Sequence, residues 1–301
     1  MLIVAKQAGI LLVFALAGYL LAKGRLADPG HGKILSVLVL YVFTPCFFMN
    51  TFLGHCTIEY LSTRWPMILV CLGIVILLNP LGYFLGRLLS RDQYERLLFA
   101  YCFITTNYGY FGFPLVQNSF GPDMLLDMMI FAMPLSIWVQ AVAFPVLTSK
   151  DHLSPKSFLN PSILSILAGI ILGISGLKVP VFVTGFLTSA GNCVGPCSML
   201  LMGISLSEYK LGDVLGNPKV YIAAALRLIV IPAVIILISS FFLPKHWLLI
   251  EAMVFAMPCG MNTVVYPKLI GKDAHLGAGL TMISSMATIV TLPLWVHILG
   301  G

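Results

Sequence analysis

Long apolar runs follow one another along almost the whole chain, and each is long enough to cross a lipid bilayer. A transmembrane helix needs about 20 mainly apolar residues. Such runs cover, approximately, residues 3–22, 33–53, 66–89, 96–119, 124–148, 161–177, 180–206, 218–243, 247–270 and 276–299. Only 9% of the residues are charged, whereas a soluble domain carries about 25%. The sequence therefore predicts an all-α integral membrane protein with about ten transmembrane helices, surrounded by the lipid bilayer.

The basic residues of the loops are distributed unevenly between the two sides of the predicted membrane. Taking every second loop from the first, one side holds twelve: Lys23, Arg25, Lys33, Arg87, Arg91, Arg96, Lys150, Lys156, Lys210, Lys219, Lys268 and Lys272. The other side, with both termini, holds four: Lys6, Arg64, Lys178 and Lys245. Because Lys and Arg collect in cytoplasmic loops, we predict both termini on the non-cytoplasmic side of the cell membrane. The net charge of +6 therefore implies no nucleic-acid partner, and the short loops suggest a bacterial inner membrane.

The seven cysteines lie mostly inside the apolar runs, where they resemble small buried residues. Cys193 and Cys197 are four residues apart on one predicted helix, but no cysteines show the loop spacing of a metal site. The sequence therefore predicts neither a metal site nor a cofactor. A coupling ion, H⁺ or Na⁺, is left open.

The two halves of the chain resemble each other. Equivalent residues recur at near-constant offsets: Pro45 and Pro196 are 151 residues apart, Pro80 and Pro232 152, Asn107 and Asn262 155, and Pro145 and Pro293 148. We therefore predict two repeats, residues 1–150 and 151–301, each with five spans. Because five is an odd number, the second repeat enters the membrane inverted relative to the first. Inverted repeats with interrupted helices recur in secondary transporters.

Helix-breaking residues interrupt the fourth and ninth spans at matching places. The segments are "NYGYFGFP", with Gly109, Gly112 and Pro114, and "MPCGMN", with Pro258 and Gly260. Unpaired backbone groups are costly in lipid, so such breaks are tolerated only inside protein or along a wet cavity. The half-helix that follows a break presents N–H groups and a positive dipole end, which favour an anion. The breaks therefore predict an anion site near the middle of the membrane.

Three segments resemble the auxin efflux carrier family, which includes bacterial organic-acid permeases and the plant PIN auxin carriers. They are "NYGYFGFPL" in the fourth span, "GNCVGPCSMLLMG" in the seventh, and "AMPCGMNTVVYPKLIGKD" with "AGLTMISSMATIVTLPLW" in the ninth and tenth. The resemblance extends over the whole chain and implies a fold like that of the bile-acid/sodium symporters. Spans 1, 2, 6 and 7 would form a scaffold, with a homodimer formed through it. Spans 3–5 and 8–10 would form a mobile transport unit in which spans 4 and 9 cross.

Five residues are candidates for substrate contact. In the plant carriers, asparagines near the crossover hold the substrate carboxylate, and by motif position the resemblance gives this role to Asn107 and Asn192. The repeat adds Asn262. Asn107 could instead cap the half-helix ends, Asn192 could bond a neighbouring helix, and Tyr108 could line a cavity or simply pack. Arg227 is the one basic residue well inside a span, so it either contacts the substrate or a gate or snorkels to the interface.

Two acidic residues, Glu95 and Glu251, lie near the starts of the fourth and ninth spans. They either satisfy helix dipoles or take part in ion coupling. No Asp or Glu lies close to either break in the sequence, although a sodium symporter of the bile-acid type needs several oxygen ligands there. Uncoupled or proton-linked transport therefore ranks above sodium coupling.

Together these features predict a secondary active or facilitative transporter, which moves a small organic anion, a mono- or dicarboxylate, by elevator-type alternating access. The alternative is a sodium-coupled symporter of the bile-acid type. A membrane-embedded enzyme or a receptor is more remote. The sequence contains no HExxH, no Gly-x-Ser-x-Gly and no paired mid-span aspartates, so we expect no enzymatic activity.

Overall fold

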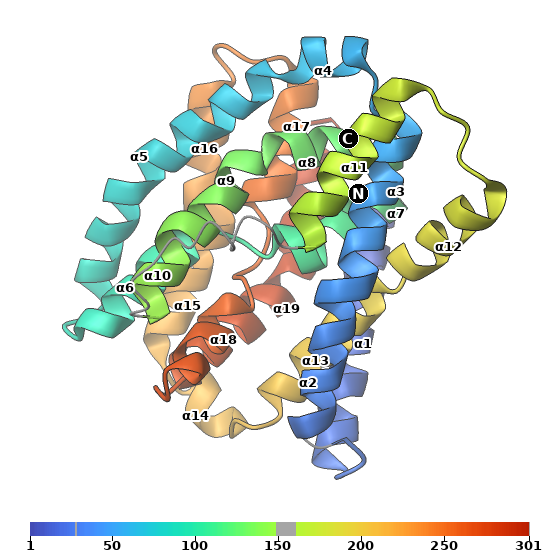
Figure 1. Ribbon diagram of the computed structural model, residues 1–301. Helices are drawn as coiled ribbons and strands as arrows, with labels where there is room; N and C mark the ends of the chain where they lie inside the picture. Colours follow the sequence, from blue (N-terminus) through green and yellow to red (C-terminus); the bar gives the residue numbers. More distant parts are fainter. Residues whose placement is uncertain (28, 149–160, 301) are drawn as a thin grey trace.

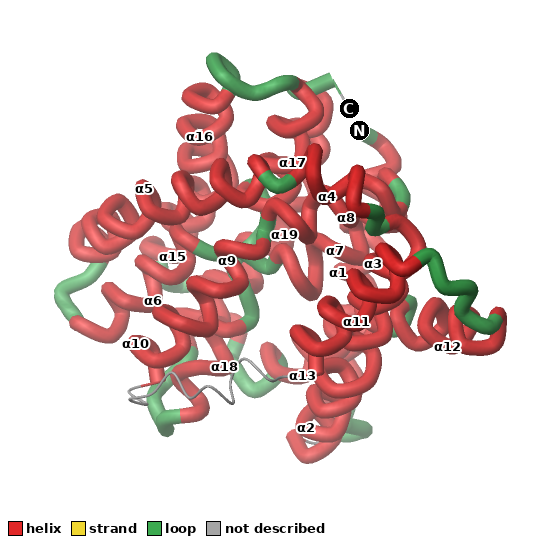
Figure 2. The backbone as a smooth tube through the Cα atoms, turned by 45° about the horizontal axis from the view of Figure 1, so that its top comes forward, coloured by secondary structure: helices red, strands yellow, loops and turns green. Residues whose placement is uncertain are grey.

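The protein is helical throughout the residues that its structure, a computed structural model, describes, namely 1–27, 29–148 and 161–300. Figure 2 shows helices joined by short loops, and no strand is present in these ranges. The all-α prediction is confirmed. The predicted boundary between the two repeats, at residues 150 and 151, lies outside the described residues.

The first half of the chain contains the elements α1 to α10 (Figure 1). Their bounds are α1 Leu2–Lys23, α2 Pro29–Leu38, η1 Val39–Phe43, α3 Thr44–His55, α4 Ile58–Arg64, α5 Pro66–Leu89, α6 Gln93–Ile104, η2 Tyr108–Gly112, α7 Phe113–Phe120, α8 Pro122–Phe131, α9 Met133–Trp138, η3 Val139–Ala143 and α10 Phe144–Thr148. The segment between the second and third apolar runs was expected to be a loop. Part of it forms α4, which begins after Thr57, whose side chain caps it by accepting a hydrogen bond from the backbone N–H of Tyr60.

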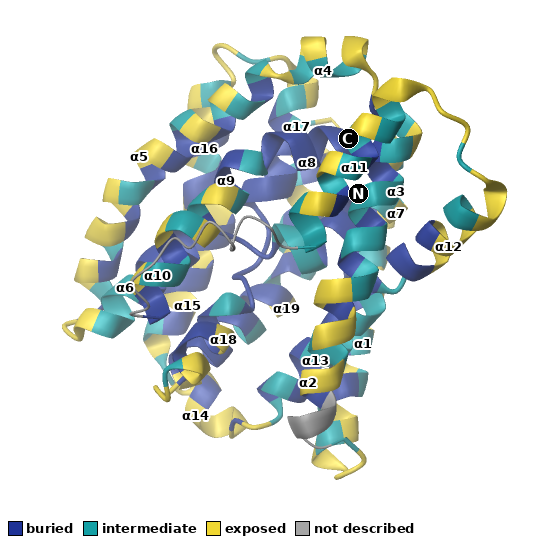
Figure 3. Ribbon diagram, viewed as in Figure 1, coloured by how far each residue is buried: buried dark blue, intermediate teal, exposed yellow. Residues whose placement is uncertain are grey.

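The second half contains α11 to α19. Their bounds are α11 Pro161–Ser175, α12 Val181–Gly191, α13 Val194–Leu206, α14 Leu211–Leu215, α15 Pro218–Ala225, η5 Leu226–Val230, α16 Ile231–Ser239, α17 Lys245–Phe255, α18 Asn262–Leu269 and α19 His275–Ile298. Figure 3 shows α8 and α17 buried at the centre, whereas α5 and α11 turn exposed faces outward. Those outer faces are apolar, with Leu77 of α5 and Ile171 of α11 among their exposed residues, as expected of a surface in contact with lipid.

The four single turns of π-helix within the described ranges have a common cause. Each of η1, η2, η3 and η5 is followed at once by an α-helix with proline in its second position: Pro45, Pro114, Pro145 and Pro232. A proline ring has no N–H and clashes with the carbonyl four residues earlier. In every case the residue before the proline bonds the carbonyl five residues back, for example Phe113 N–H to Tyr108 O, and this wider turn accommodates the ring.

Six helices of the described chain are long and apolar enough to cross a membrane: Leu2–Lys23, Gly32–His55, Ile58–Leu89, Val181–Leu206, Pro218–Ser239 and His275–Ile298. The pair Pro122–Phe131 and Met133–Thr148, bent by 49°, forms a seventh if it counts as one span. α11 is apolar but shorter, and the fourth and ninth predicted spans are interrupted. The multi-pass membrane fold is therefore confirmed, while the count of about ten spans stays a prediction.

The two halves pack against each other in a reciprocal way. α1, the first span of the first half, packs most extensively on α13 in the second span of the second half, and α11 packs correspondingly on α3. Glycines make both contacts close. A Cβ on Gly203 of α13 would lie 1.9 Å from the Ala15 carbonyl of α1, and one on Gly173 of α11 would lie 2.8 Å from the Cys56 and Phe52 carbonyls. Small residues at such contacts are typical of membrane helices. This exchange of partners agrees with a repeat, although its inverted orientation stays a prediction.

Candidate functional site

The breaks in the fourth and ninth predicted spans lie against each other. The first separates α6 from η2, and the second separates α17 from α18. The backbone N–H of Asn107 in the first break donates to the carbonyl of Pro258 in the second at 2.8 Å. Thr106 Oγ1 also donates to the Val254 carbonyl of α17 at 2.8 Å. The predicted interruptions are thus present. Backbone and side-chain donors of the first break bond backbone carbonyls of the second break and of the end of α17.

Asn107 keeps an unused hydrogen-bond donor inside the protein. The residue is 3% exposed, and its backbone carbonyl accepts from the N–H groups of Phe111 and Gly112 at 3.1 and 3.0 Å. Its side chain makes no capping hydrogen bond. Nδ2 is buried without a partner among the described residues. The capping alternative is therefore wrong for the side chain, because the main chain alone holds this helix end.

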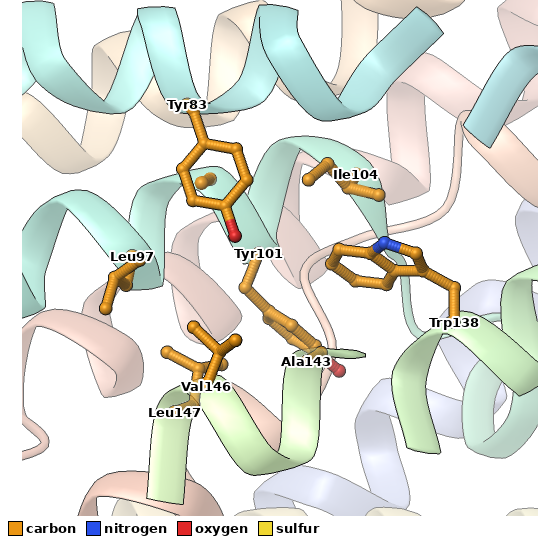
Figure 4. Close-up of a pocket in the computed structure, with 9 residues that line it drawn as sticks. Tyr83, Leu97, Tyr101, Ile104, Trp138, Ala143, Val146 and Leu147 are labelled. Atoms are coloured by element: carbon orange, nitrogen blue, oxygen red, sulfur yellow. The ribbon is translucent and has the colours of Figure 1, made fainter. Parts of the chain in front are cut away.

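Asn262, the matching residue of the second half, has its donor occupied. It is the first residue of α18, and its Nδ2 donates to the Tyr101 hydroxyl of α6 at 3.0 Å. The Tyr101 ring stacks on Trp138 and meets Tyr266 edge-on. Figure 4 shows Tyr101, Trp138 and Tyr83 around a small cavity of about 10 Å³. A space of this size holds about one water molecule, so it is too small for an organic anion.

Asn192 lines a much larger cavity, of about 270 Å³. This cavity lies among α1, α3, α7 and the junction of α12 with α13, and none of its lining residues is charged. It carries four carboxamide side chains, Gln7, Gln117, Asn118 and Asn192, beside apolar residues such as Ile10, Leu11, Phe14 and Phe47. Sequence reasoning missed Gln7, Gln117 and Asn118. The polar amides within two apolar runs were the signal that could have found them.

Two glycines bring the α12–α13 junction close to the other walls of this cavity. A Cβ on Gly191 would lie 3.1 Å from Phe47 Cα of α3, and one on Gly195 would lie 2.9 Å from Pro114 Cβ of α7. Any larger residue would push the walls apart. The motif around Asn192 therefore places its side chain at the contact between the α1–α13 pair and the half-helix that follows the first break.

Ring contacts connect the cavity wall with the first break. Phe47 stacks on Phe113 at 6.5 Å between centroids, and Phe113 meets Tyr108 edge-on at 5.5 Å. The Tyr108 hydroxyl hydrogen-bonds Ser136 Oγ at 2.7 Å. Tyr108 is next to Asn107 in the chain. It does not line the cavity, but its ring is connected through Phe113 to Phe47 in the cavity wall.

The other predicted break residues have different roles. Pro114 lines the cavity, and Pro258 supplies the carbonyl that accepts from Asn107. A Cβ on Gly112 would lie 3.0 Å from Met128 Cε, so its small size serves packing. A glycine can permit close approach or a positive φ, but the φ of Gly109 is not positive. Apart from its chain neighbours and the backbone of its own helix, no described residue lies within 4 Å of a Cβ built there. A Cβ on Gly260 would make only ordinary contacts.

Arg227, in η5, does not snorkel to the interface, because it is fully buried. Its Nη1 donates to the Phe103 carbonyl near the end of α6 at a long 3.5 Å. Nε and Nη2 have no partner among the described residues. The guanidinium thus lies at the negative end of the half-helix that precedes the first break, where a cation is favoured. It does not line the large cavity.

A buried carboxylate that the sequence analysis missed lies on α8. Asp127 is 2% exposed and accepts from the Tyr60 hydroxyl at 2.6 Å, while His246 Nε2 and Arg64 Nε lie 2.7 and 3.0 Å from its oxygens. These partners come from α4 and the start of α17. The cluster ties three elements together. The presence of Asp127 inside the apolar run 124–148 could have indicated this cluster, because acidic residues are rare within membrane helices.

Two comparisons with known proteins identify the family of this chain. A family model described as "Membrane transport protein" matches residues 3–153 and again residues 145–296. An uncharacterized transporter of Methanocaldococcus jannaschii is 28% identical to this chain over 309 residues, covering 96% of this chain and 97% of that protein. Both matches extend over almost the whole chain and confirm the resemblance carried by the three sequence segments. The chain therefore belongs to the family of membrane transport proteins that includes the auxin efflux carriers.

Proposed function

We propose that this protein moves a small organic anion, a mono- or dicarboxylate, across the cell membrane by elevator-type alternating access. The observation that carries the proposal is the cavity of about 270 Å³ with four carboxamides in its wall. Two of them, Gln117 and Asn118, belong to α7, which follows the first break. The other two, Gln7 and Asn192, belong to α1 and the α12–α13 junction. The cavity thus lies between the predicted mobile unit and the predicted scaffold.

Carboxamides suit a carboxylate that must leave water. Each amide N–H₂ provides two donors, and a hydrogen bond to a charged group contributes roughly 1.5–3 kcal/mol. The apolar part of the wall, with Leu11 and Phe47 among its members, can cover the carbon skeleton of the same molecule. A substrate with a charged head and an apolar body therefore matches both kinds of lining.

The first break adds a positive charge, which the cavity lining lacks, and one more amide donor. The buried Nδ2 of Asn107 is an unused donor, and Arg227 contributes a buried positive charge on the α6 side of the same break. Phe47 lines the cavity, Phe113 contacts both Phe47 and Tyr108, and Tyr108 follows Asn107 in the chain. We propose that the anion first meets the cavity amides and then Asn107, once these rings separate as α7 moves relative to α3.

A binding screen tests this function. Ligands that bind the folded protein raise its apparent stability by mass action, so purified protein is heated with a panel of mono- and dicarboxylates. We expect stabilisation by at least one carboxylate, with weaker binding after Gln117→Ala or Asn192→Ala. Gln93→Ala is the matched control, because Gln93 is an exposed amide at the start of α6 and does not line the cavity. The proposal would be contradicted if no carboxylate stabilised the protein, or if all variants bound the carboxylate as tightly as the parent.

A further inference from the structure

Glu251 is a fully buried acidic residue that the proposed carboxylate site does not use. It lies on α17 and is 0% exposed. Its Oε1 accepts a hydrogen bond from Ser239 Oγ at 2.7 Å. Its Oε2 is buried and has no hydrogen-bond partner within the described chain. No described Lys, Arg or His forms an ion pair with it.

The neighbours of α17 provide no charge that offsets an ionised Glu251. α8 brings Asp127, whose own partners are Arg64 and His246. α16 contains no charged residue and α19 only His275 and His297 near its two ends, of which His275 pairs with Asp273 and His297 is exposed. η2 brings Tyr108, which bonds Ser136, and Tyr110. None of these groups is a cation free to pair with a carboxylate.

An unpaired ionised carboxylate is very costly in such surroundings, and the group becomes neutral instead. These surroundings therefore favour the neutral, protonated form of Glu251. A protonated carboxyl group satisfies one oxygen by accepting from Ser239, and its own O–H becomes a donor. The remaining question is whether this proton is permanent or exchanges with the solution.

The first half of the chain contains a similar serine–glutamate pair in a different environment. Ser90 Oγ donates to Glu95 Oε2 at 2.6 Å, and Lys219 Nζ lies 3.5 Å from the same oxygen. The side chain of Glu95 is 38% exposed. Ser239 and Glu251 follow Ser90 and Glu95 by 149 and 156 residues, close to the other repeat offsets. Both repeats thus carry a serine–glutamate hydrogen bond at a matching place. In the first half the glutamate is partly exposed and lies beside a lysine, whereas in the second half it is buried and has no ion-pair partner among the described residues.

Ser239 offers a route between Glu251 and water. It is the last residue of α16 and is only half-buried, and an exposed turn follows it before α17 begins. For release, the Ser239 hydroxyl first turns its hydrogen toward water, so that Oγ accepts the carboxyl O–H instead of donating to it. The carboxyl proton then moves to Oγ as the hydroxyl proton leaves to water. The balance is simple: Glu251 changes between carboxylic acid and carboxylate, and one proton enters or leaves the solution at this end of α16 and α17.

We propose that Glu251 is a proton-binding site, protonated in this conformation and in exchange with the solution beside the α16–α17 turn through Ser239. The role of this proton in driving transport rests on the proposed function. Its binding and release at Glu251 do not, because they can be measured without a substrate.

Infrared difference spectroscopy on the full protein in proteoliposomes tests the site directly. Buffers of low and high pH are exchanged, and the C=O stretching band of protonated carboxyl groups is recorded, with ¹³C-labelled glutamate to identify the residue type. We expect a glutamic-acid band that disappears at high pH and is missing in Glu251→Gln. Glu95→Gln is the matched control and should leave the band unchanged, because Glu95 is paired with Lys219.

A second variant separates proton exchange from mere burial. Ser239→Ala removes the one hydrogen bond to Glu251, so the band should shift in frequency and respond more slowly to the change of buffer. If Glu251→Gln is not monodisperse, this shift still assigns the band. A band that persists in Glu251→Gln, or one that never changes with pH, would overturn the proposal. If no carboxylate stabilises the protein in the binding screen, only the proposed function is contradicted, and the proposed proton binding at Glu251 is unaffected.

Discussion

The two helix breaks carry asparagines at matching sequence positions, yet the asparagines have different partners. Nδ2 of Asn262 donates to Tyr101 at 3.0 Å, whereas Nδ2 of Asn107 is buried without a partner in the described part of the chain. The difference teaches that a repeat predicts where a polar group lies, but not whether its bonding capacity is already used. Of these two side-chain amides, only that of Asn107 is without a hydrogen-bond partner among the described residues.

The residues around the two breaks also differ in how far their polar groups are already hydrogen-bonded. Beside the second break, Thr263 Oγ1 bonds the Gly260 carbonyl and Thr281 Oγ1 at 2.8 and 2.9 Å, so these oxygens satisfy one another. Beside the first break, ring contacts lead from Tyr108 and Phe113 to the large cavity. Ring contacts therefore connect the first break to the large cavity, whereas polar side chains beside the second break bond other groups of the protein.

The largest expected effect is the difference in thiol labelling between positions on the two sides of the membrane. In an inverted repeat the half-helices after the two breaks run in opposite directions, so α7 should end outside the cell and α18 inside. In a variant without the native cysteines, Asp123→Cys should react with an impermeant thiol reagent from outside. Lys272→Cys and Lys210→Cys should react only after the membrane is permeabilised. Labelling of all three from one side, or the reverse pattern, would break the inverted arrangement on which the comparison depends.

Substitution of Arg227 should give the second-largest effect, because this residue adds a positive charge beside the first break only. It donates to the Phe103 carbonyl of α6, and the matching end of α17 has no buried cation within the described chain. Arg227→Gln should weaken anion binding by about ten- to a hundredfold, since bonds to charged groups contribute roughly 1.5–3 kcal/mol. Arg227→Lys should also bind weakly, because a lysine at this buried position lacks the planar fork of donors. Calorimetric titration measures both, and parent-like affinity in both variants would exclude Arg227 from the site.

Asn262 should show the smallest effect, and on stability only. Asn262→Ala removes the hydrogen bond to Tyr101, which contributes roughly 0.5–1.5 kcal/mol. Tyr101→Phe is the matched variant, because it removes the same bond from the other side. Both should unfold more readily on thermal denaturation and bind the anion as tightly as the parent. If Asn262→Ala weakens binding while Tyr101→Phe does not, Asn262 contacts the substrate and the two breaks are equivalent after all.

Much of the fold was predictable because membrane helices depend on local sequence. The length of the apolar runs indicated the helices, and glycine and proline indicated the breaks, since both act on the backbone at their own position. Two local details were missed. The helix α4 lies in a segment expected to be a loop, and a π turn precedes Pro45, Pro114, Pro145 and Pro232.

The site was less predictable because it depends on contacts between distant residues. Hydropathy left open whether Arg227 snorkels, since it does not show which way a side chain turns within the bundle. The cavity combines Gln7, Gln117 and Asn192 from three separate elements, and Asp127 meets Arg64 and His246 across 63 and 119 residues of sequence. Such partners follow from packing, which one sequence does not contain.

Binding by Asn107 variants tests the central claim most directly. With a carboxylate identified by thermal shift, the dissociation constant is measured by calorimetry for the parent, Asn107→Ala and Asn107→Asp. Losing one hydrogen bond to a charged group should weaken binding by about one to two orders of magnitude in Asn107→Ala. Asn107→Asp should bind more weakly still, because it sets a like charge against the anion. If both variants fold and bind as tightly as the parent, the free amide at the first break holds no substrate, and the central claim is wrong.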